Sequence, residues 1–174
     1  LTRYNLSEEY NGSAWTEGNN LNQARNSIAG CGTQTAALGF GGYIGPVTGK
    51  TEEYNGTSWT EQNDLNTAGY DMGSAGTQTA GLAFGGSSYP PLTRYNLSEE
   101  YNCSACTEGN NLNQARNSIS GCGTQTAALG FGGYIGPVTC ITEEYNVTSW
   151  TEQNDLNTSW YTMLSAVTHT SGLV

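Results

Sequence analysis

The stretch Leu1-Thr2-Arg3-Tyr4-Asn5-Leu6-Ser7-Glu8-Glu9-Tyr10 returns unchanged at residues 92–101. The 91-residue shift holds to the end of the chain, and 69 of the 83 aligned pairs are identical. Each half contains two copies of a weaker phrase, Ser/Thr-Glu-Glu-Tyr-Asn, whose tyrosines stand at positions 10, 54, 101 and 145. The period is therefore 44, 47 and 44 residues. A period in this range indicates a repeat architecture, which restricts the fold before any local argument.

One repeat unit, residues 25–62, predicts four short strands. The segments 26–31 and 36–40 are small and apolar, and Gly41-Gly42 ends the second of them. The segments 51–55 and 58–61 follow, joined at Asn55-Gly56, which is a strong hairpin signal because both turn residues need positive φ. No stretch of the chain repeats its apolar residues at the helical period, so we expect almost no helix.

Four antiparallel strands at this period are typical of a β-propeller blade. A double glycine that ends an apolar strand, followed by a Tyr and then a Trp about five residues later, resembles the kelch repeat of galactose-oxidase-like propellers. The residues that carry this resemblance are Gly41-Gly42 with Tyr54 and Trp59, Gly85-Gly86 with Tyr101, and Gly132-Gly133 with Tyr145 and Trp150. The units are shorter than typical kelch units, and Cys106 replaces one Trp.

The order of strands along the chain predicts how the blades are completed. The chain opens with the third and fourth strands of a unit, about 7–11 and 14–17, and ends with a first and second strand, about 160–167 and 169–174. We therefore expect one all-β domain over residues 1–174, a propeller of four four-stranded antiparallel blades. Resemblance to other propellers implies that residues 170–174 pair with residues 6–11 and close the ring. A fragment of a larger propeller, or a ring built from two chains, is the alternative, so the protein is a monomer or a dimer.

Composition disfavours several classes of partner. Fifteen acidic residues against five basic ones give a net charge of −10, which repels nucleic-acid backbones and anionic membrane surfaces. No run of about 18 apolar residues is present to span a bilayer. A single histidine argues against most catalytic triads and multi-histidine metal sites, so we predict no metal and no cofactor.

The five cysteines include a C-x-x-C pair, Cys103 and Cys106. This spacing is that of thiol–disulfide oxidoreductases and of half a zinc site. A zinc site would need a second ligand pair, which the sequence lacks. We expect Cys103 and Cys106 to lie on opposite arms of a tight hairpin and to form a local disulfide.

The paired acids that recur in every unit, such as Glu52-Glu53, cannot form one carboxylate dyad, because adjacent strand residues point to opposite faces. We expect them to form a solvated strand edge. The tryptophans of the fourth strand are expected to pack between blades.

Two functional hypotheses follow. The first is a non-catalytic binding or structural propeller whose loops hold a protein or carbohydrate ligand, with Tyr43, Tyr89 and Tyr134 as candidate binding-loop residues. The alternative is a thiol–disulfide oxidoreductase centred on Cys103 and Cys106. The near-identical halves also favour recent amplification, a pattern seen in phage and environmental sequences. Nothing in the sequence indicates a cellular location.

Overall fold

The computed structural model describes residues 2–163, 166–168 and 171–173, and this part of the chain contains strands and no helix. Accordingly, no membrane-spanning helix is found among these residues. The strands are β1 (Glu8–Tyr10), β2 (Trp15–Glu17), β3 (Ala29–Thr33), β4 (Ala36–Phe40), β5 (Thr51–Tyr54), β6 (Trp59–Glu61), β7 (Gly73–Gly76), β8 (Gly81–Phe84), β9 (Ser87–Ser88), β10 (Thr93–Arg94), β11 (Ser98–Tyr101), β12 (Cys106–Glu108), β13 (Ser120–Gly123), β14 (Ala128–Phe131), β15 (Thr142–Tyr145), β16 (Trp150–Glu152), β17 (Ala166–Thr168) and β18 (Ser171–Leu173).

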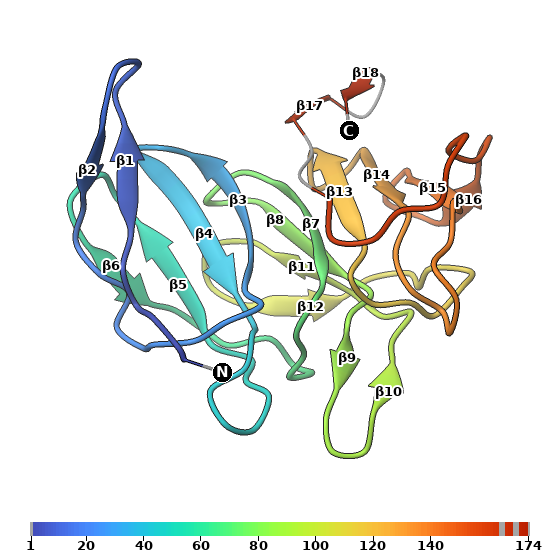
Figure 1. The fold of residues 1–174 in the computed structure, drawn as a ribbon, viewed down its shortest axis with the longest axis horizontal. Coiled ribbons are helices and arrows are strands. Elements are labelled where there is room, and N and C mark those ends of the chain that lie inside the picture. Colours follow the sequence, from blue (N-terminus) through green and yellow to red (C-terminus); the bar gives the residue numbers. More distant parts are fainter. Residues whose placement is uncertain (1, 164–165, 169–170, 174) are drawn as a thin grey trace.

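Three sheets have four antiparallel strands each, and each sheet is one repeat unit. Their strand orders are β3-β4-β5-β6, β7-β8-β11-β12 and β13-β14-β15-β16. Figure 1 shows the three sheets side by side in an arc, and their first strands, β3, β7 and β13, lie next to one another. The all-β class and the four-stranded antiparallel unit that the sequence predicts are thus confirmed.

The double glycine lies where one unit touches the next. Gly41 has a φ of +66°, and a Cβ atom there would lie 2.6 Å from the carbonyl oxygen of Gly69. The amide of Gly42 donates to that same oxygen at 2.8 Å. The contact recurs where Gly86 N donates to Arg116 O and where Gly133 N donates to Trp160 O. Any side chain at the first glycine would force the two units apart, so the motif is needed for their packing.

A chain of backbone hydrogen bonds links four residues at one repeat position. Each has a left-handed φ between 52° and 55°, and they are Ser27, Asp71, Ser118 and Thr162. The amide of Asp71 donates to Ser27, that of Ser118 to Asp71, and that of Thr162 to Ser118, at 3.3, 2.7 and 3.0 Å. The residues that follow them, Ile28, Met72, Ile119 and Met163, line one cavity of about 230 Å³. One residue of each repeat unit therefore takes part in this chain of bonds, and the residue after it lines the cavity.

The hydrophobic core lies between neighbouring sheets. Phe84 of β8 contacts Trp150 of β16, with ring centroids 4.8 Å apart, and their side chains are buried. Leu38 and Phe40 of β4 belong to an equivalent cluster with Tyr101 of the next sheet. Trp150 thus packs between sheets, as the sequence predicts, and burial of such a side chain supplies about 2–3 kcal/mol. Trp15 of β2, at the same repeat position, is 66% exposed, so the prediction is wrong for that residue.

The prediction that the paired acids form a solvated edge is wrong. The first acid of the pair is buried in each complete sheet, at Glu52, Glu99 and Glu143, which are 1%, 6% and 0% exposed. Glu52 forms an ion pair with Arg25 at 3.0 Å, and Glu143 forms one with Arg116 at 2.8 Å. A buried carboxylate is tolerated when a charged partner and hydrogen-bond donors surround it. The alternation expected along the strand is present, but it points one acid of each pair inward.

The expected closure of the ring is not present in the described residues, where β1 pairs only with β2, and β17 only with β18. Residues 169–170 and 174 of the expected closing strand lie outside the described part. Figure 1 shows β1–β2 at one end of the arc, whereas β17 lies against β13 at the other. Pairing of the two chain ends joins residues that are far apart in sequence, so it would carry the largest loop-closure cost of any contact in the chain.

Candidate functional site

A pocket of about 280 Å³ opens among the loops between strands, and tyrosines form most of its wall. Tyr43 comes from the loop after β4, and Tyr70 from the segment before β7. Tyr89 stands at the tip of the β9–β10 hairpin, which projects at the bottom of Figure 1. The lining is completed by Asn26 and Ser27. Loops of two successive sheets therefore build this site together.

Paired backbone hydrogen bonds fix the tyrosine loops. The backbones of Asn26 and Tyr43 exchange two bonds, of 3.2 and 2.9 Å. Tyr70 and Ser87 exchange a similar pair, of 3.1 and 3.0 Å. Two of the three tyrosines are therefore held by the same ladder-like contact, so the pocket is positioned by the backbone rather than by mobile side chains.

Two of the aromatic rings are tilted against each other. Tyr43 and Tyr70 have ring centroids 6.0 Å apart and an interplanar angle of 60°. The guanidinium of Arg3 lies 5.2 Å from the centroid of Tyr43, a cation–π contact that restrains this ring. Tyr89 is 52% exposed, so its ring is free to contact a ligand.

Two buried polar atoms beside Tyr43 have no hydrogen-bond partner among the described residues: Nε of Arg3 and Oδ1 of Asn26. Their repeat equivalents in the second half behave differently, because Arg94 Nε donates to Asn117 Oδ1 at 3.2 Å. A buried polar group without a partner costs about 1–3 kcal/mol. Asn26 lines the first-half pocket and its Oδ1 atom is buried and unpaired, whereas the equivalent atoms of Arg94 and Asn117 bond to each other.

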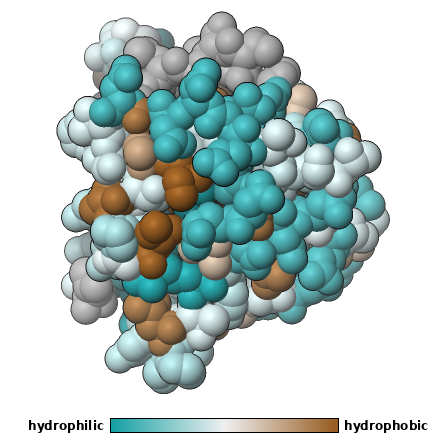
Figure 2. Space-filling view, turned by 90° about the vertical axis from the view of Figure 1, so that its right-hand side faces the viewer, coloured by the Kyte–Doolittle hydropathy of each residue, from teal (hydrophilic) through white to brown (hydrophobic). Residues whose placement is uncertain are grey.

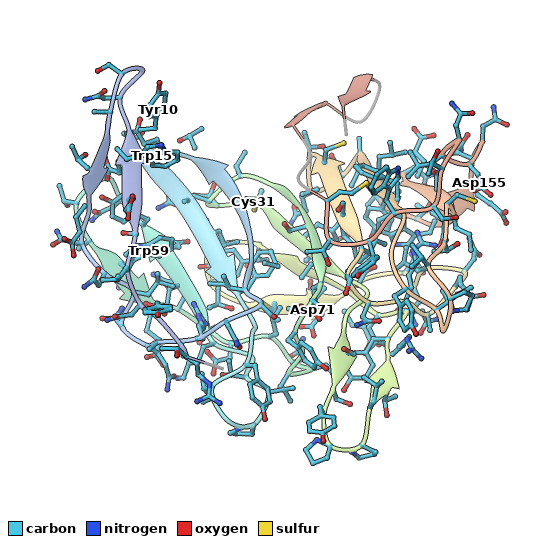
Figure 3. All side chains as sticks on the ribbon, in the orientation of Figure 1. Tyr10, Trp15, Cys31, Trp59, Asp71 and Asp155 are labelled. Carbon is cyan, nitrogen blue, oxygen red and sulfur yellow. The ribbon has the colours of Figure 1, made fainter. Side chains whose placement is uncertain are left out.

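Asp71 follows Tyr70 and joins the pocket to the central chain of hydrogen bonds. Burial raises the pKa of the Asp71 carboxyl, and the side chains of Ser27 and Asn117 oppose this by hydrogen bonding to it. Figure 3 shows Asp71 at the middle of the arc, between the first and third sheets.

The structure brings together two of the three tyrosines that the sequence singles out. Tyr43 and Tyr89 line the same pocket, and Tyr134 does not. Tyr134 instead bonds to the backbone of Asn117 and lies under the guanidinium of Arg94, 4.8 Å from its ring centroid. Sequence analysis missed Tyr70 and Asn26, which occupy one repeat position in successive units. That shared position, at the start of the predicted strand 26–31 in the first unit, was the available signal.

The expected disulfide between Cys103 and Cys106 is not formed, and all five cysteines are free thiols. Cys106 pairs across the sheet with Tyr101, so Cys103 lies within the turn and not on the opposite arm. Cys103 has a φ of 74° and directs its sulfur to the carbonyl of Thr79, 3.2 Å away. The turn between β11 and β12 spans residues 102–105, whereas a disulfide across the two strands would need Cys103 to stand opposite Cys106.

Cys106 also lacks the electrostatic setting of a redox thiol. Burial, together with the nearby carboxylates of Glu99 and Asp64, raises the pKa of Cys106 to about 12. Catalytic thiols have a lowered pKa, because the thiolate is the nucleophile. No observation here favours the oxidoreductase alternative.

Metal binding has no obvious ligand set in the part of the chain that is described: no cluster of three or more His, Cys, Asp or Glu side chains is found there.

No protein-family model matches the chain, and no curated protein matches it significantly. The resemblance to kelch repeats therefore rests on the glycine, tyrosine and tryptophan positions quoted above.

Proposed function

We propose that the protein is a non-catalytic binding module and that the pocket of Tyr43, Tyr70 and Tyr89 holds a neutral carbohydrate. The observation that carries this proposal is the combination of three tyrosines with the unpaired Asn26 Oδ1 in one pocket. Aromatic rings stack on the apolar face of a sugar, and its hydroxyl groups supply both donors and acceptors. Phenolic hydroxyls and an amide oxygen are suitable partners for those hydroxyl groups.

Size and charge support a small neutral ligand over other partners. The pocket, at about 280 Å³, is near the lower end of the ~300–1,000 Å³ range of small-molecule sites, which suits one or two sugar rings. A stable protein partner would instead cover about 800 Å² of surface on each side. The net charge of −10 repels anionic ligands.

The test is calorimetric titration with a panel of neutral mono- and disaccharides. We expect at least one to bind, and Tyr43→Ala, Tyr70→Ala and Asn26→Ala each to weaken it about tenfold, equivalent to about 1.4 kcal/mol. The repeat provides matched controls, since Tyr134→Ala and Asn117→Ala change the equivalent residues outside the pocket and should leave the affinity unchanged. The proposal fails if no saccharide binds, if the controls weaken binding equally, or if only a protein partner binds at this face.

The arrangement that best accounts for a shared loop face is a four-bladed, kelch-like propeller. The hydrogen-bonded chain from Ser27 to Thr162 supports it, because one residue of each unit takes part at the same repeat position. In that arrangement β17–β18 and β1–β2 are two halves of the fourth blade, and the tyrosine pocket lies on one end of the ring. A ring assembled from two chains is the alternative, and the mass of the protein in solution separates the two.

A further inference from the structure

Neighbouring sheets are joined by a tyrosine–glutamate hydrogen bond that recurs at each junction in the arc. The hydroxyl of Tyr101 donates to Glu53 at 2.8 Å, and that of Tyr145 donates to Glu100 at 2.6 Å. Tyr54 makes the same bond to Glu9 of the N-terminal hairpin. In each case the tyrosine of one unit binds the second acid of the preceding unit.

A second contact recurs beside it, between an asparagine in the segment before each sheet and the first acid of that sheet's pair. The backbone amides of Asn22, Asn66 and Asn113 donate to Glu52, Glu99 and Glu143, each at 2.7 Å. Their side-chain amides reach the carbonyl oxygens of Trp59, Cys106 and Trp150, at 2.9–3.0 Å. The asparagine therefore clamps the outer two strands of the sheet that follows it.

The N-terminal hairpin has the tyrosine and the first acid for both contacts, but neither Tyr10 nor Glu8 has the corresponding partner among the described residues. Tyr10 and Trp15 are 48% and 66% exposed, whereas their equivalents Tyr145 and Trp150 are 1% and 4% exposed. Glu8 is also exposed, although its three equivalents are buried. Figure 3 shows Tyr10 and Trp15 at one end of the arc and Asp155 at the other.

The matching partners stand at the opposite end of the chain. By the repeat, Glu144 of β15 is the equivalent of Glu53 and Glu100, and Asn157 is the equivalent of Asn22, Asn66 and Asn113. We infer that the N-terminal hairpin and the β13–β16 sheet make a fourth junction. In it the hydroxyl group of Tyr10 donates a hydrogen bond to Glu144, and Asn157 bonds to Glu8 and to the carbonyl oxygen of Trp15. This inference rests on the four-bladed arrangement proposed above and names the contacts that hold it shut.

A carboxylate at the position of Glu144 can serve more than one donor. Glu53 accepts the hydroxyl of Tyr101 on one oxygen and the side-chain amide of Gln62, at 3.4 Å, on the other. A glutamate at this repeat position can therefore accept a tyrosine hydroxyl together with a second donor.

The partner of the exposed hairpin is the same chain rather than a second copy. A tethered segment acts at an effective concentration in the millimolar range, which a second molecule reaches only in concentrated solution. Two copies, each with a net charge of −10, also repel one another. The side of the molecule that carries β15 and β16 is largely hydrophilic, with its apolar residues gathered toward one edge, as Figure 2 shows.

A double-mutant cycle on Tyr10→Phe and Glu144→Gln tests the junction. Each single change should lower the folding equilibrium constant about tenfold, and the second change should have little further effect once the first is present. The cycle on Tyr101→Phe and Glu53→Gln, a contact already present in the arc, is the matched control and should give the same coupling. Both are mild substitutions on exposed or half-buried polar atoms, so the variants should fold.

The mass of each variant, measured by light scattering, completes the test. Coupling in a monomer supports the inference. Coupling in a dimer means that a second copy supplies Glu144, which overturns the inference. Additive effects at Tyr10 and Glu144, when the control pair is coupled, mean that the arc stays open, which also overturns the inference. Neither measurement uses a saccharide, so a failure of this inference is separate from a failure of the proposed ligand site.

Discussion

Arg116 and Glu143 form an ion pair from which water is excluded: Nη1 lies 2.8 Å from Oε1, and the two side chains are 0% and 1% exposed. The other oxygen of Glu143 accepts two bonds from Asn113, and Arg116 Nη2 donates to the carbonyl of Gly130 at 3.3 Å. Burial lowers the pKa of Arg116, and the charge of Glu143 opposes that change. The pair fixes the segment before β13 against β14 and β15 of the same sheet.

Loss of one partner of this pair should be costly. Arg116→Met keeps the length of the side chain but leaves the Glu143 carboxylate buried without its cation, which we expect to lower the free energy of unfolding by about 3–5 kcal/mol. Urea unfolding measures the change. Adding Glu143→Gln to Arg116→Met should recover part of the loss, because the uncompensated charge is then removed. A loss below about 1 kcal/mol in Arg116→Met would contradict this account.

The turn at Val147 should be strained. Val147 has a φ of 76°, and the equivalent turn positions carry Gly12 and Gly56 at φ values of 95° and 88°. A β-branched residue in this region costs about 1–3 kcal/mol. Val147→Gly should therefore stabilise the protein by about 1 kcal/mol, visible as a rise of about 2–4 °C in the melting temperature. Gly56→Val is the reverse control and should lower it; equal melting temperatures for both would refute the strain.

Asp71 should make stability depend on pH in a direction opposite to most acids. Burial raises its pKa in the folded protein above the ordinary value of 3.8, so the folded state binds the proton more tightly than the unfolded state does. The stability that Asp71 contributes is therefore present below pH 3.8 and is lost as the pH rises through the folded pKa.

The test of this direction is Asp71→Ser, which places at this position the residue found at Ser27 and Ser118. We expect the variant to be more stable than the parent at pH 7 and the difference to shrink as the pH approaches 3.5, as measured by urea unfolding at each pH. If Asp71→Ser instead loses stability equally at both pH values, the hydrogen bonds from Ser27 and Asn117 outweigh the burial of the charge.

Local signals in the sequence predict the sheets well because each acts within one unit. The Asn-Gly turn places β5 and β6, and the double glycine marks where Gly41 meets Gly69 of the next unit. The burial of Glu52 was not predictable in the same way, since its partner Arg25 lies just before the predicted strand 26–31, and nothing local in the sequence links the two residues. The pocket was only partly predictable for the same reason. Tyr43 and Tyr89 were identifiable as loop aromatics, but whether they meet Tyr70 depends on how two sheets pack together.

Cys106 occupies the place of a tryptophan, and the neighbouring strand has adapted to it. Trp59 and Trp150 lie against Gly39 and Gly130, where a Cβ atom would come within 3.5 and 3.2 Å of the indole ring. The repeat equivalent of these glycines beside Cys106 is Ala83, and both belong to one buried cluster. The added methyl group fills part of the space in which an indole would lie.

Restoring the tryptophan alone should therefore fail to stabilise the protein. Cys106→Trp should overpack against Ala83 and cost about 1–3 kcal/mol. Adding Ala83→Gly should relieve the contact and make the double variant at least as stable as the parent, because it recreates the pairing of Gly130 with Trp150. Thermal unfolding of the parent, the two single variants and the double variant measures this coupling. Ala83→Gly on its own opens a cavity beside Cys106, so it should destabilise the parent protein. We therefore expect Ala83→Gly to lower the melting temperature of the parent and to raise that of Cys106→Trp. The same sign in both would show that Ala83 and residue 106 do not share this space.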